Sequence, residues 1–204
     1  MKIIGIGKNY INDKSEIAAL KTGDQVIFLK AESTLVTNNK DIPFPKITNQ
    51  LNYEVELVAK IGKSGKEIPE SDAASYISEI GIGIDYTAKD VLNATRANKG
   101  PWTLAKGFDG ASPINGFKPV SNFSDINDIN FSLMINGKEV QAGNTSDMIY
   151  NFVEIITFIS NYMTLEPGDL IFTGTPASGA GQNFKGDHLQ ASIEGELLLD
   201  FKLI

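Results

Sequence analysis

The stretch LNYEVELVAKI, residues 51–61, decides the fold of this chain and holds its most unusual polar pattern. Apolar residues at every second position, from Tyr53 to Ile61, predict a strand with one face in the core. Glu54 and Glu56 then share the opposite face, about 7 Å apart at ~3.4 Å per residue. Two explanations stay open for this pair: a solvated strand face, interrupted by Val58, or a site for a hard divalent cation such as Mg²⁺ or Mn²⁺.

A second acidic residue of interest ends the stretch GIGID, residues 81–85. Glycines in an apolar strand indicate close approach of another backbone, and strand ends are common places for functional residues. Asp85 would otherwise serve as a helix N-cap. Thr87 and Asp90 already form a T-x-x-D capping box for the next helix, which favours a functional role for Asp85.

Strands outnumber helices in the rest of the chain and do not alternate with them. Asn136-Gly137 and Glu194-Gly195 are turn signals of the hairpin type. We therefore predict a strand-dominated, mostly antiparallel α+β fold. The predicted strands are residues 2–6, 25–29, 53–61, 80–85, 131–135, 138–141, 169–173 and 188–203, and the predicted helices are residues 12–20, 69–80, 87–98 and 147–162.

Composition narrows the class of protein. The 204 residues show no linker, so one domain over residues 1–204 is expected. A net charge of −7, with 18 Lys and Arg against 25 acids, argues against nucleic-acid and membrane-surface partners. No targeting or membrane-spanning pattern is seen, so a cytoplasmic protein is expected. Without cysteine and with His188 as the single histidine, thiolate and multi-histidine metal sites are excluded.

Seven short motifs, in order along nearly the whole chain, carry a resemblance to a known family. The chain resembles the fumarylacetoacetate hydrolase family, close to its short acylpyruvase and oxaloacetate decarboxylase branch. Each motif alone is weak, and their order makes the set specific. The motifs are GIGKNY (residues 5–10), VIFLK (26–30), YEVEL (53–57), GIDYTAKD (83–90), KGPWTLAK (99–106), GNTS (143–146) and FTGTP (172–176).

The resemblance implies a fold, an assembly and a set of site residues. The implied fold is a mixed β-sandwich roll, usually a homodimer, in which residues 1–50 form an N-terminal segment with a lid-like helix. The implied substrate is a small 2-oxo or dicarboxylic acid. The resemblance implies that Glu54, Glu56 and Asp85 bind Mg²⁺ or Mn²⁺, that Lys106 lies in the active site, and that Thr175, with Gly174 and Lys8, binds substrate.

The chemistry implied is C–C bond cleavage through a stabilised enolate. A 2-oxo acid can chelate a cation held by three carboxylates, which stabilises charge on the C2 oxygen. Lys106 would stabilise or protonate that enolate. Acylpyruvate hydrolysis and oxaloacetate decarboxylation or tautomerisation are the expected reactions. A 2-hydroxyhepta-2,4-diene-1,7-dioate-type isomerase, or a catalytically impaired relative that only binds metal and 2-oxo acid, are the alternatives.

Three positions depart from the family pattern. The family usually carries a His-x-x-Glu pair as its catalytic base, and here the pair reads Asp13 and Glu16. We expect these two residues to occupy the position of the base, although aspartate is a weaker base, with a reference pKa of about 3.9. Leu92 replaces a common glutamine, and Lys8 replaces a common arginine and so loses its bidentate fork. These changes affect hydrolysis more than decarboxylation or tautomerisation.

Overall fold

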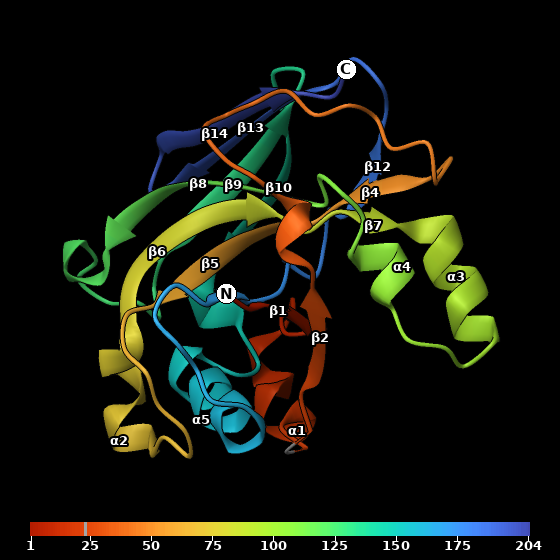
Figure 1. The fold of residues 1–204 in the computed structure, drawn as a ribbon. Helices are drawn as coiled ribbons and strands as arrows, with labels where there is room; N and C mark the ends of the chain where they lie inside the picture. Colours follow the sequence, from red (N-terminus) through yellow and green to blue (C-terminus); the bar gives the residue numbers. More distant parts are fainter. Residues whose placement is uncertain (23) are drawn as a thin grey trace.

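The computed structural model describes residues 1–22 and 24–204, and packed β-sheets form its centre (Figure 1). The largest sheet in this part of the chain has seven strands, in the order β2-β1-β11-β5-β6-β8-β3. Strands β1 and β11 run parallel, as do β3 and β8, and the other neighbours are antiparallel. The bounds are Ile3–Gly7 (β1), Val26–Lys30 (β2), Leu35–Val36 (β3), Val55–Ile61 (β5), Ile77–Ile84 (β6), Ser112–Pro119 (β8) and Leu170–Phe172 (β11).

The second sheet is built from two hairpins in the order β10-β9-β13-β14. Asn136 and Gly137 turn between β9 and β10 with φ of 52° and 79°, and Glu194 and Gly195 turn between β13 and β14 with φ of 49° and 76°. Left-handed conformations at both turn positions match the twist of antiparallel strands, so both hairpin predictions are confirmed. The bounds are Asn130–Ile135 (β9), Lys138–Asn144 (β10), His188–Ile193 (β13) and Glu196–Lys202 (β14).

A small third sheet explains the position of Glu54. It has the order β12-β4-β7, with bounds Leu51–Tyr53 (β4), Thr87–Ala88 (β7) and Gly181–Asn183 (β12). The stretch predicted as one strand is thus divided: β4 belongs to this small sheet and β5 to the largest one. Glu54 lies at the break, where the chain passes from one sheet to the other.

The main core lies between the two larger sheets. Val55, Leu57 and Ala59 on β5 are buried there, as the alternation predicted, together with Leu133 of β9 and Ala191 of β13. The other face of β5 is also covered, because Val58 packs into a smaller cluster with residues of β1, β8 and β11. A strand buried on both faces is incompatible with the solvated face that was one explanation of the Glu54–Glu56 pair.

Helices are short and cover the edges of the sheets (Figure 1). The longest in the described residues, α5, begins after a capping box, in which Asn151 Oδ1 accepts from the Glu154 N–H and Glu154 Oε2 accepts from the Asn151 N–H. None of the helices in the described chain is long and apolar enough to cross a membrane. The α-helices are Ile17–Leu20 (α1), Glu70–Ala73 (α2), Lys89–Ala97 (α3), Thr103–Lys106 (α4) and Phe152–Tyr162 (α5), and the 3₁₀ turns are Lys14–Glu16, Glu32–Thr34, Ala74–Tyr76, Val120–Asn122 and Thr145–Asp147.

The predicted fold class, strand-dominated α+β, is confirmed, and four further local predictions are corrected. The helix predicted for residues 147–162 begins at Phe152, because Asn151 caps it. The helix predicted for residues 69–80 ends at Tyr76, because the apolar residues from Ile77 onward continue into β6. Strand β8 was not predicted, since its prolines and Gly116 resemble a loop. The T-x-x-D capping box does not form: Ala88 is the N-cap of α3, and the Thr87 hydroxyl donates to Glu54 instead.

Candidate active site

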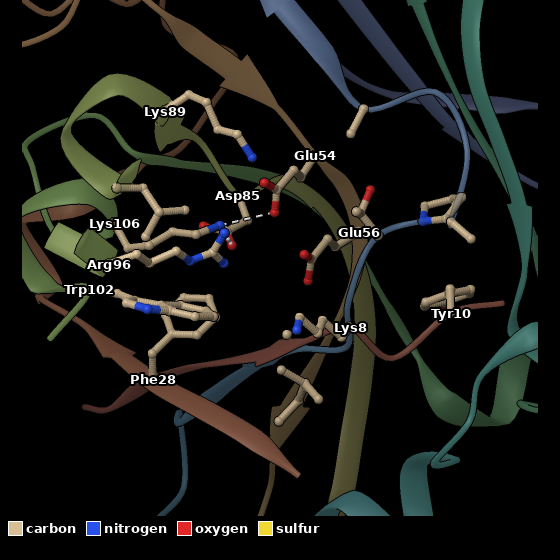
Figure 2. Close-up of a pocket in the computed structure, with 17 residues that line it drawn as sticks. Lys8, Tyr10, Phe28, Glu54, Glu56, Asp85, Lys89, Arg96, Trp102 and Lys106 are labelled. Atoms are coloured by element: carbon tan, nitrogen blue, oxygen red, sulfur yellow. Dashed lines mark hydrogen bonds and ion pairs between the residues drawn. The ribbon is translucent and has the colours of Figure 1, made fainter. Parts of the chain in front are cut away.

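A pocket of about 350 Å³ is lined by strands β1, β2 and β5 of the largest sheet, by helices α3 and α4, and by the loop after β11. Acidic side chains lie on one wall and aromatic and basic side chains face them, as Figure 2 shows. Of the predicted site residues, the structure places Lys8, Glu54, Glu56, Asp85, Lys106 and Thr175 in the lining.

Backbone pairing brings the three predicted metal-binding carboxylates together. Strands β5 and β6 pair with Glu56 opposite Gly83, and the Asp85 N–H donates to the Glu54 carbonyl oxygen at 2.8 Å just beyond them. One carboxylate oxygen from each of Glu54, Glu56 and Asp85 lies within 4.8 Å of the others. Glu54 is half-buried, and the other two residues are buried. Three oxygen ligands in this arrangement could hold a divalent cation.

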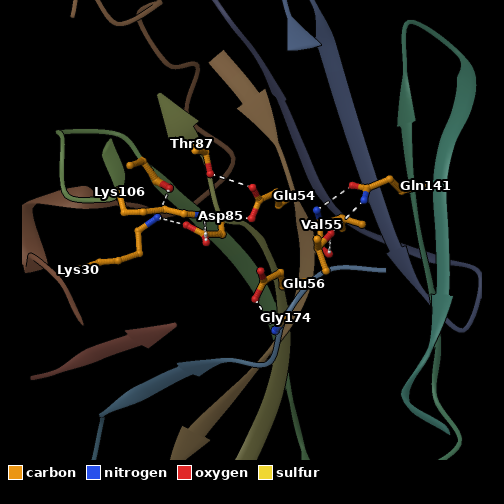
Figure 3. Close-up of polar contacts among 11 residues, drawn as sticks. Lys30, Glu54, Val55, Glu56, Asp85, Thr87, Lys106, Gln141 and Gly174 are labelled. Carbon is orange, nitrogen blue, oxygen red and sulfur yellow. Dashed lines mark hydrogen bonds and ion pairs between the residues drawn. The ribbon is translucent and has the colours of Figure 1, made fainter. Parts of the chain in front are cut away.

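Two buried lysines neutralise Asp85 (Figure 3). Lys106 Nζ donates to Asp85 Oδ2 at 2.5 Å and to Glu54 Oε2 at 2.9 Å. Lys30 Nζ donates to Asp85 Oδ1 and, at 2.8 Å, to the Ala111 carbonyl oxygen. Each carboxylate oxygen of Asp85 thus accepts a hydrogen bond from a lysine ammonium group.

Burial and charge act in opposite directions on the pKa values here. Burial alone would raise the pKa of Asp85, but the ammonium groups of Lys106 and Lys30 outweigh it and hold the pKa below its usual value. Burial alone would lower the pKa of Lys106, but the carboxylates of Asp85 and Glu54 raise it. For Lys30 burial is the larger effect, and its pKa is lowered.

Glu56 is the carboxylate that most clearly fits a metal ion. Its Oε2 accepts from the Gly174 N–H at 2.8 Å. Among the described residues, no Lys, Arg or His nitrogen lies within 4.0 Å of its carboxylate. Burial, followed by repulsion from Asp85 and Glu54, raises the pKa of Glu56 well above its usual value. A buried carboxylate with no cationic partner, facing two others, is the environment that a divalent cation would stabilise.

One face of helix α3 forms the opposite wall. Lys89, Leu92 and Arg96 are spaced at i, i+3 and i+7, which places them on the same side of a helix, and all three line the pocket. Trp102 and Phe28 continue this wall, with ring centroids 5.6 Å apart. Leu92, where the family commonly has glutamine, presents an apolar side chain here.

The loop after β11 contributes backbone and hydroxyl groups. Gly174 has φ of 99°, a conformation that glycine adopts without strain, and its N–H contacts Glu56. The Thr175 hydroxyl donates to the Val55 carbonyl oxygen and accepts from Gln141 Nε2, both at 2.9 Å. Thr175 therefore lines the pocket with its hydroxyl already hydrogen-bonded to the protein. Its predicted contact with a substrate carboxylate stays a prediction.

The residues predicted at the position of the base lie outside the pocket lining. Asp13 is exposed and caps a 3₁₀ turn, with Oδ1 accepting from the Ser15 N–H at 2.9 Å and from its hydroxyl at 2.7 Å. These hydrogen bonds lower the pKa of Asp13. Glu16, in the same turn, is also exposed. Their role as a general base stays a prediction.

Sequence reasoning missed Lys30, Lys89 and Arg96. Lys30 ends an apolar strand and belongs to the VIFLK motif, so the motif held a signal that was not assigned a role. A helix was predicted for residues 87–98, and its i, i+7 spacing could have shown that Lys89 and Arg96 share one helix face. Their orientation toward the pocket depends on how α3 packs, which no local pattern specifies.

Comparison with known proteins identifies the family of the chain. The family model for the fumarylacetoacetate (FAA) hydrolase C-terminal region matches residues 2–200. The chain belongs to the fumarylacetoacetate hydrolase family. A curated relative from Mus musculus, the mitochondrial oxaloacetate tautomerase FAHD1, is 35% identical over 98% of this chain and 90% of its own length. The mitochondrial oxaloacetate decarboxylase of Dictyostelium discoideum is 36% identical over 95% of this chain and 89% of its own length.

A solved structure of the family carries ligands that bear on the site. The fumarylpyruvate hydrolase of Pseudomonas aeruginosa, in complex with Mn²⁺ and pyruvate, matches with a TM-score of 0.89 and 29% identity, over 100% of this chain and 90% of that one. Family membership and this fold support the assignment of the chain as an enzyme of the hydrolase, lyase or isomerase type.

Proposed function

We propose that the protein is a divalent-metal-dependent enzyme that acts on a small 2-oxo acid by tautomerisation or decarboxylation of the oxaloacetate type. The observation that carries the proposal is the cluster of Glu54, Glu56 and Asp85 with the Lys106 ammonium at its edge, in one pocket. Relatives named as oxaloacetate tautomerase and oxaloacetate decarboxylase support the substrate class.

In this proposal Glu54, Glu56 and Asp85 hold Mg²⁺ or Mn²⁺. The bound ion would supply a Lewis acid for the 2-oxo group of the substrate. The Mn²⁺ in the structure of the fumarylpyruvate hydrolase supports a divalent ion of this kind. The Gly174 N–H and the Thr87 hydroxyl orient Glu56 and Glu54, and Lys30 orients Asp85 from behind the site. Such supporting contacts fix the direction of ligand oxygens.

The proposed role of Lys106 is to donate to the substrate. In decarboxylation the C3–C4 bond breaks, CO₂ leaves, and the electron pair moves through C2 to the keto oxygen; protonation at C3 then gives the product. In tautomerisation a proton moves between C3 and that oxygen. The Lys106 ammonium is positioned by two carboxylates at the edge of the proposed metal site, where it would stabilise the developing oxyanion or deliver a proton.

Acylpyruvate hydrolysis is the less favoured reaction in this proposal. Hydrolysis requires a base that activates water, and Asp13 and Glu16 are exposed and outside the pocket lining. The single histidine, His188, lies on β13 and contacts Asp200 at 2.6 Å. Tautomerisation and decarboxylation need an electron sink, which the metal ion held by the three carboxylates would supply, and a proton transfer, which is the proposed role of Lys106.

Turnover of a panel of 2-oxo acids with Mg²⁺ and with Mn²⁺ tests the proposal. We expect metal-dependent turnover of oxaloacetate above that of acetylpyruvate. Glu56→Gln removes one ligand oxygen's charge and should lower turnover at least about 100-fold. Saturating Mg²⁺ should raise the melting temperature of the wild type by about 5–10 °C and leave that of the variant unchanged. Full activity of Glu56→Gln, or an equal metal response in both proteins, would contradict the assignment.

A further inference from the structure

The pocket lining has more positively charged side chains than negatively charged ones. Cationic side chains in the lining outnumber carboxylates, although the whole chain has a net charge of −7. Lys106 is ion-paired to two of those carboxylates. Within residues 1–22 and 24–204, no carboxylate oxygen lies within 4.0 Å of the charged groups of Lys8, Lys89 or Arg96. The lining has four basic side chains against three carboxylates, and the divalent cation of the proposed function would add two further positive charges. A ligand with a single carboxylate would then leave an excess of positive charge.

Arg96 is the most specifically placed of these three cations. It lies in the last turn of α3, one helical turn beyond Leu92, and Figure 2 shows its guanidinium pointing into the pocket beside Lys106. Leu92 offers no hydrogen-bond donor or acceptor on this wall. Polar recognition of a ligand on the α3 side therefore depends on the basic residues of the helix.

The Arg96 guanidinium lies over the aromatic wall of the pocket. The Arg96 guanidinium carbon lies 4.7 Å from the centroid of the Trp102 ring, and Trp102 in turn packs against Phe28. Stacking uses the face of the guanidinium and leaves the N–H groups along its edge free to donate. That edge matches the two oxygens of a carboxylate in a bidentate pair.

We propose that Arg96, stacked on Trp102, is the specificity-determining residue of the pocket and binds the second carboxylate of a dicarboxylic 2-oxo acid. The inference rests on the proposed function, which places the 2-oxo acid end of the ligand at Glu54, Glu56 and Asp85. Acids with an anionic tail then bind more tightly than acids with a neutral tail of the same length. Lys89, on the same helix face, adds positive charge but lacks the planar guanidinium group that pairs with both oxygens of a carboxylate.

Trp102 provides a direct readout of binding, because it is the single tryptophan of the chain. Its fluorescence can be titrated, in the presence of Mg²⁺, with 2-oxoglutarate and with 2-oxopentanoate, which have equal chain lengths and differ in tail charge. The wild type should bind 2-oxoglutarate about tenfold or more tightly than 2-oxopentanoate. Arg96→Gln should reduce this preference to about twofold or less.

Lys66→Gln is the matched control, because Lys66 is exposed, lies outside the pocket lining, and its substitution removes the same charge. It should keep the wild-type preference. A preference retained in Arg96→Gln, or absent from the wild type, would overturn the inference. If the wild type turns over oxaloacetate and Arg96→Gln keeps the preference, the inference alone fails. If the wild type neither binds the two acids nor turns over any 2-oxo acid, the proposed function fails as well.

Discussion

Asp85 is the residue at which the site is assembled. Its carboxylate contacts Lys30 on one side and Lys106 on the other, and its backbone N–H contacts the segment that carries Glu54. A buried acid with two lysine partners is costly to desolvate and is rarely retained for stability alone. The arrangement fits a site in which lysines neutralise the carboxylates until a metal ion takes part of that role.

Lys106→Gln should have opposite effects on metal binding and on turnover. The Lys106 ammonium contacts carboxylate oxygens of Glu54 and Asp85, two of the proposed metal ligands, so we expect it to compete with the ion. Its removal should tighten Mg²⁺ binding about tenfold, as measured by isothermal titration calorimetry. Turnover of oxaloacetate should fall about 100-fold or more, because the proposed donor is lost.

The exposed Lys99 provides a control for that experiment, because Lys99→Gln removes the same charge outside the pocket lining. This variant should change neither quantity by more than about twofold. Weaker Mg²⁺ binding in Lys106→Gln than in the wild type would argue against competition between the ammonium and the ion.

At the residue scale, the sequence allowed prediction of the acidic cluster and missed most of its basic surroundings. Glu54 and Glu56 are recognisable from strand periodicity, and Asp85 from its place at a strand end. Strand periodicity gives no signal for Lys30, because a lysine that ends an apolar strand usually reaches solvent. It is buried here because its ammonium meets Asp85 and a backbone carbonyl oxygen contributed by distant segments.

At the scale of elements, turn chemistry was more informative than apolar periodicity. A two-residue hairpin turn requires left-handed backbone, which the glycines of Asn136-Gly137 and Glu194-Gly195 adopt without strain, and each pair predicted its hairpin correctly. Residues 69–80 contain apolar residues at spacings that suit either a helix or a strand. Residues from Ile77 onward form a strand because β6 pairs with β5 and β8. This pairing depends on the tertiary structure and cannot be inferred from the local sequence.

The capping box of α5 is expected to contribute measurably to stability. Asn151→Ala removes the Oδ1 acceptor of the Glu154 N–H and should lower the free energy of unfolding by about 1 kcal/mol. For a chain of this size the melting temperature should fall by about 2–4 °C. Asn93→Ala, at an exposed position inside α3, is the control and should leave stability equal or slightly higher. Equal losses in the two variants would show that the cap is not the cause.

At the scale of the whole molecule, Asp187 joins two of the sheets. One of its oxygens accepts from the Phe184 N–H at 2.7 Å and from Asn183 Nδ2, at the end of β12, at 2.9 Å. The other accepts at 2.9 Å from Asn136 Nδ2 in the β9–β10 turn. Partial burial alone would raise the pKa of Asp187, but these hydrogen bonds outweigh it and lower the pKa.

Acid unfolding should therefore depend on Asp187. A carboxyl group with a lowered folded-state pKa stabilises the protein above its unfolded pKa of about 3.9, and this contribution is lost as the pH falls through the folded value. Asp187→Asn should reduce the free energy of unfolding by about 1–2 kcal/mol at pH 7, and the difference from the wild type should shrink below about pH 4. Urea unfolding at several pH values measures both. Asp109→Asn, at an exposed site, should follow the wild type, and a difference for Asp187→Asn that is independent of pH would refute the role of its charge.

The order of the strands in the largest sheet has a consequence for how the protein is made. Strand β1 pairs in parallel with β11, with Ile3 opposite Leu170, so its partner is translated only near the end of the chain. At about 5–20 residues per second, the ribosome takes about 10–30 s to reach that partner. Throughout this interval the nascent chain carries an apolar strand with one edge unpaired, and we expect chaperones to protect that edge during synthesis.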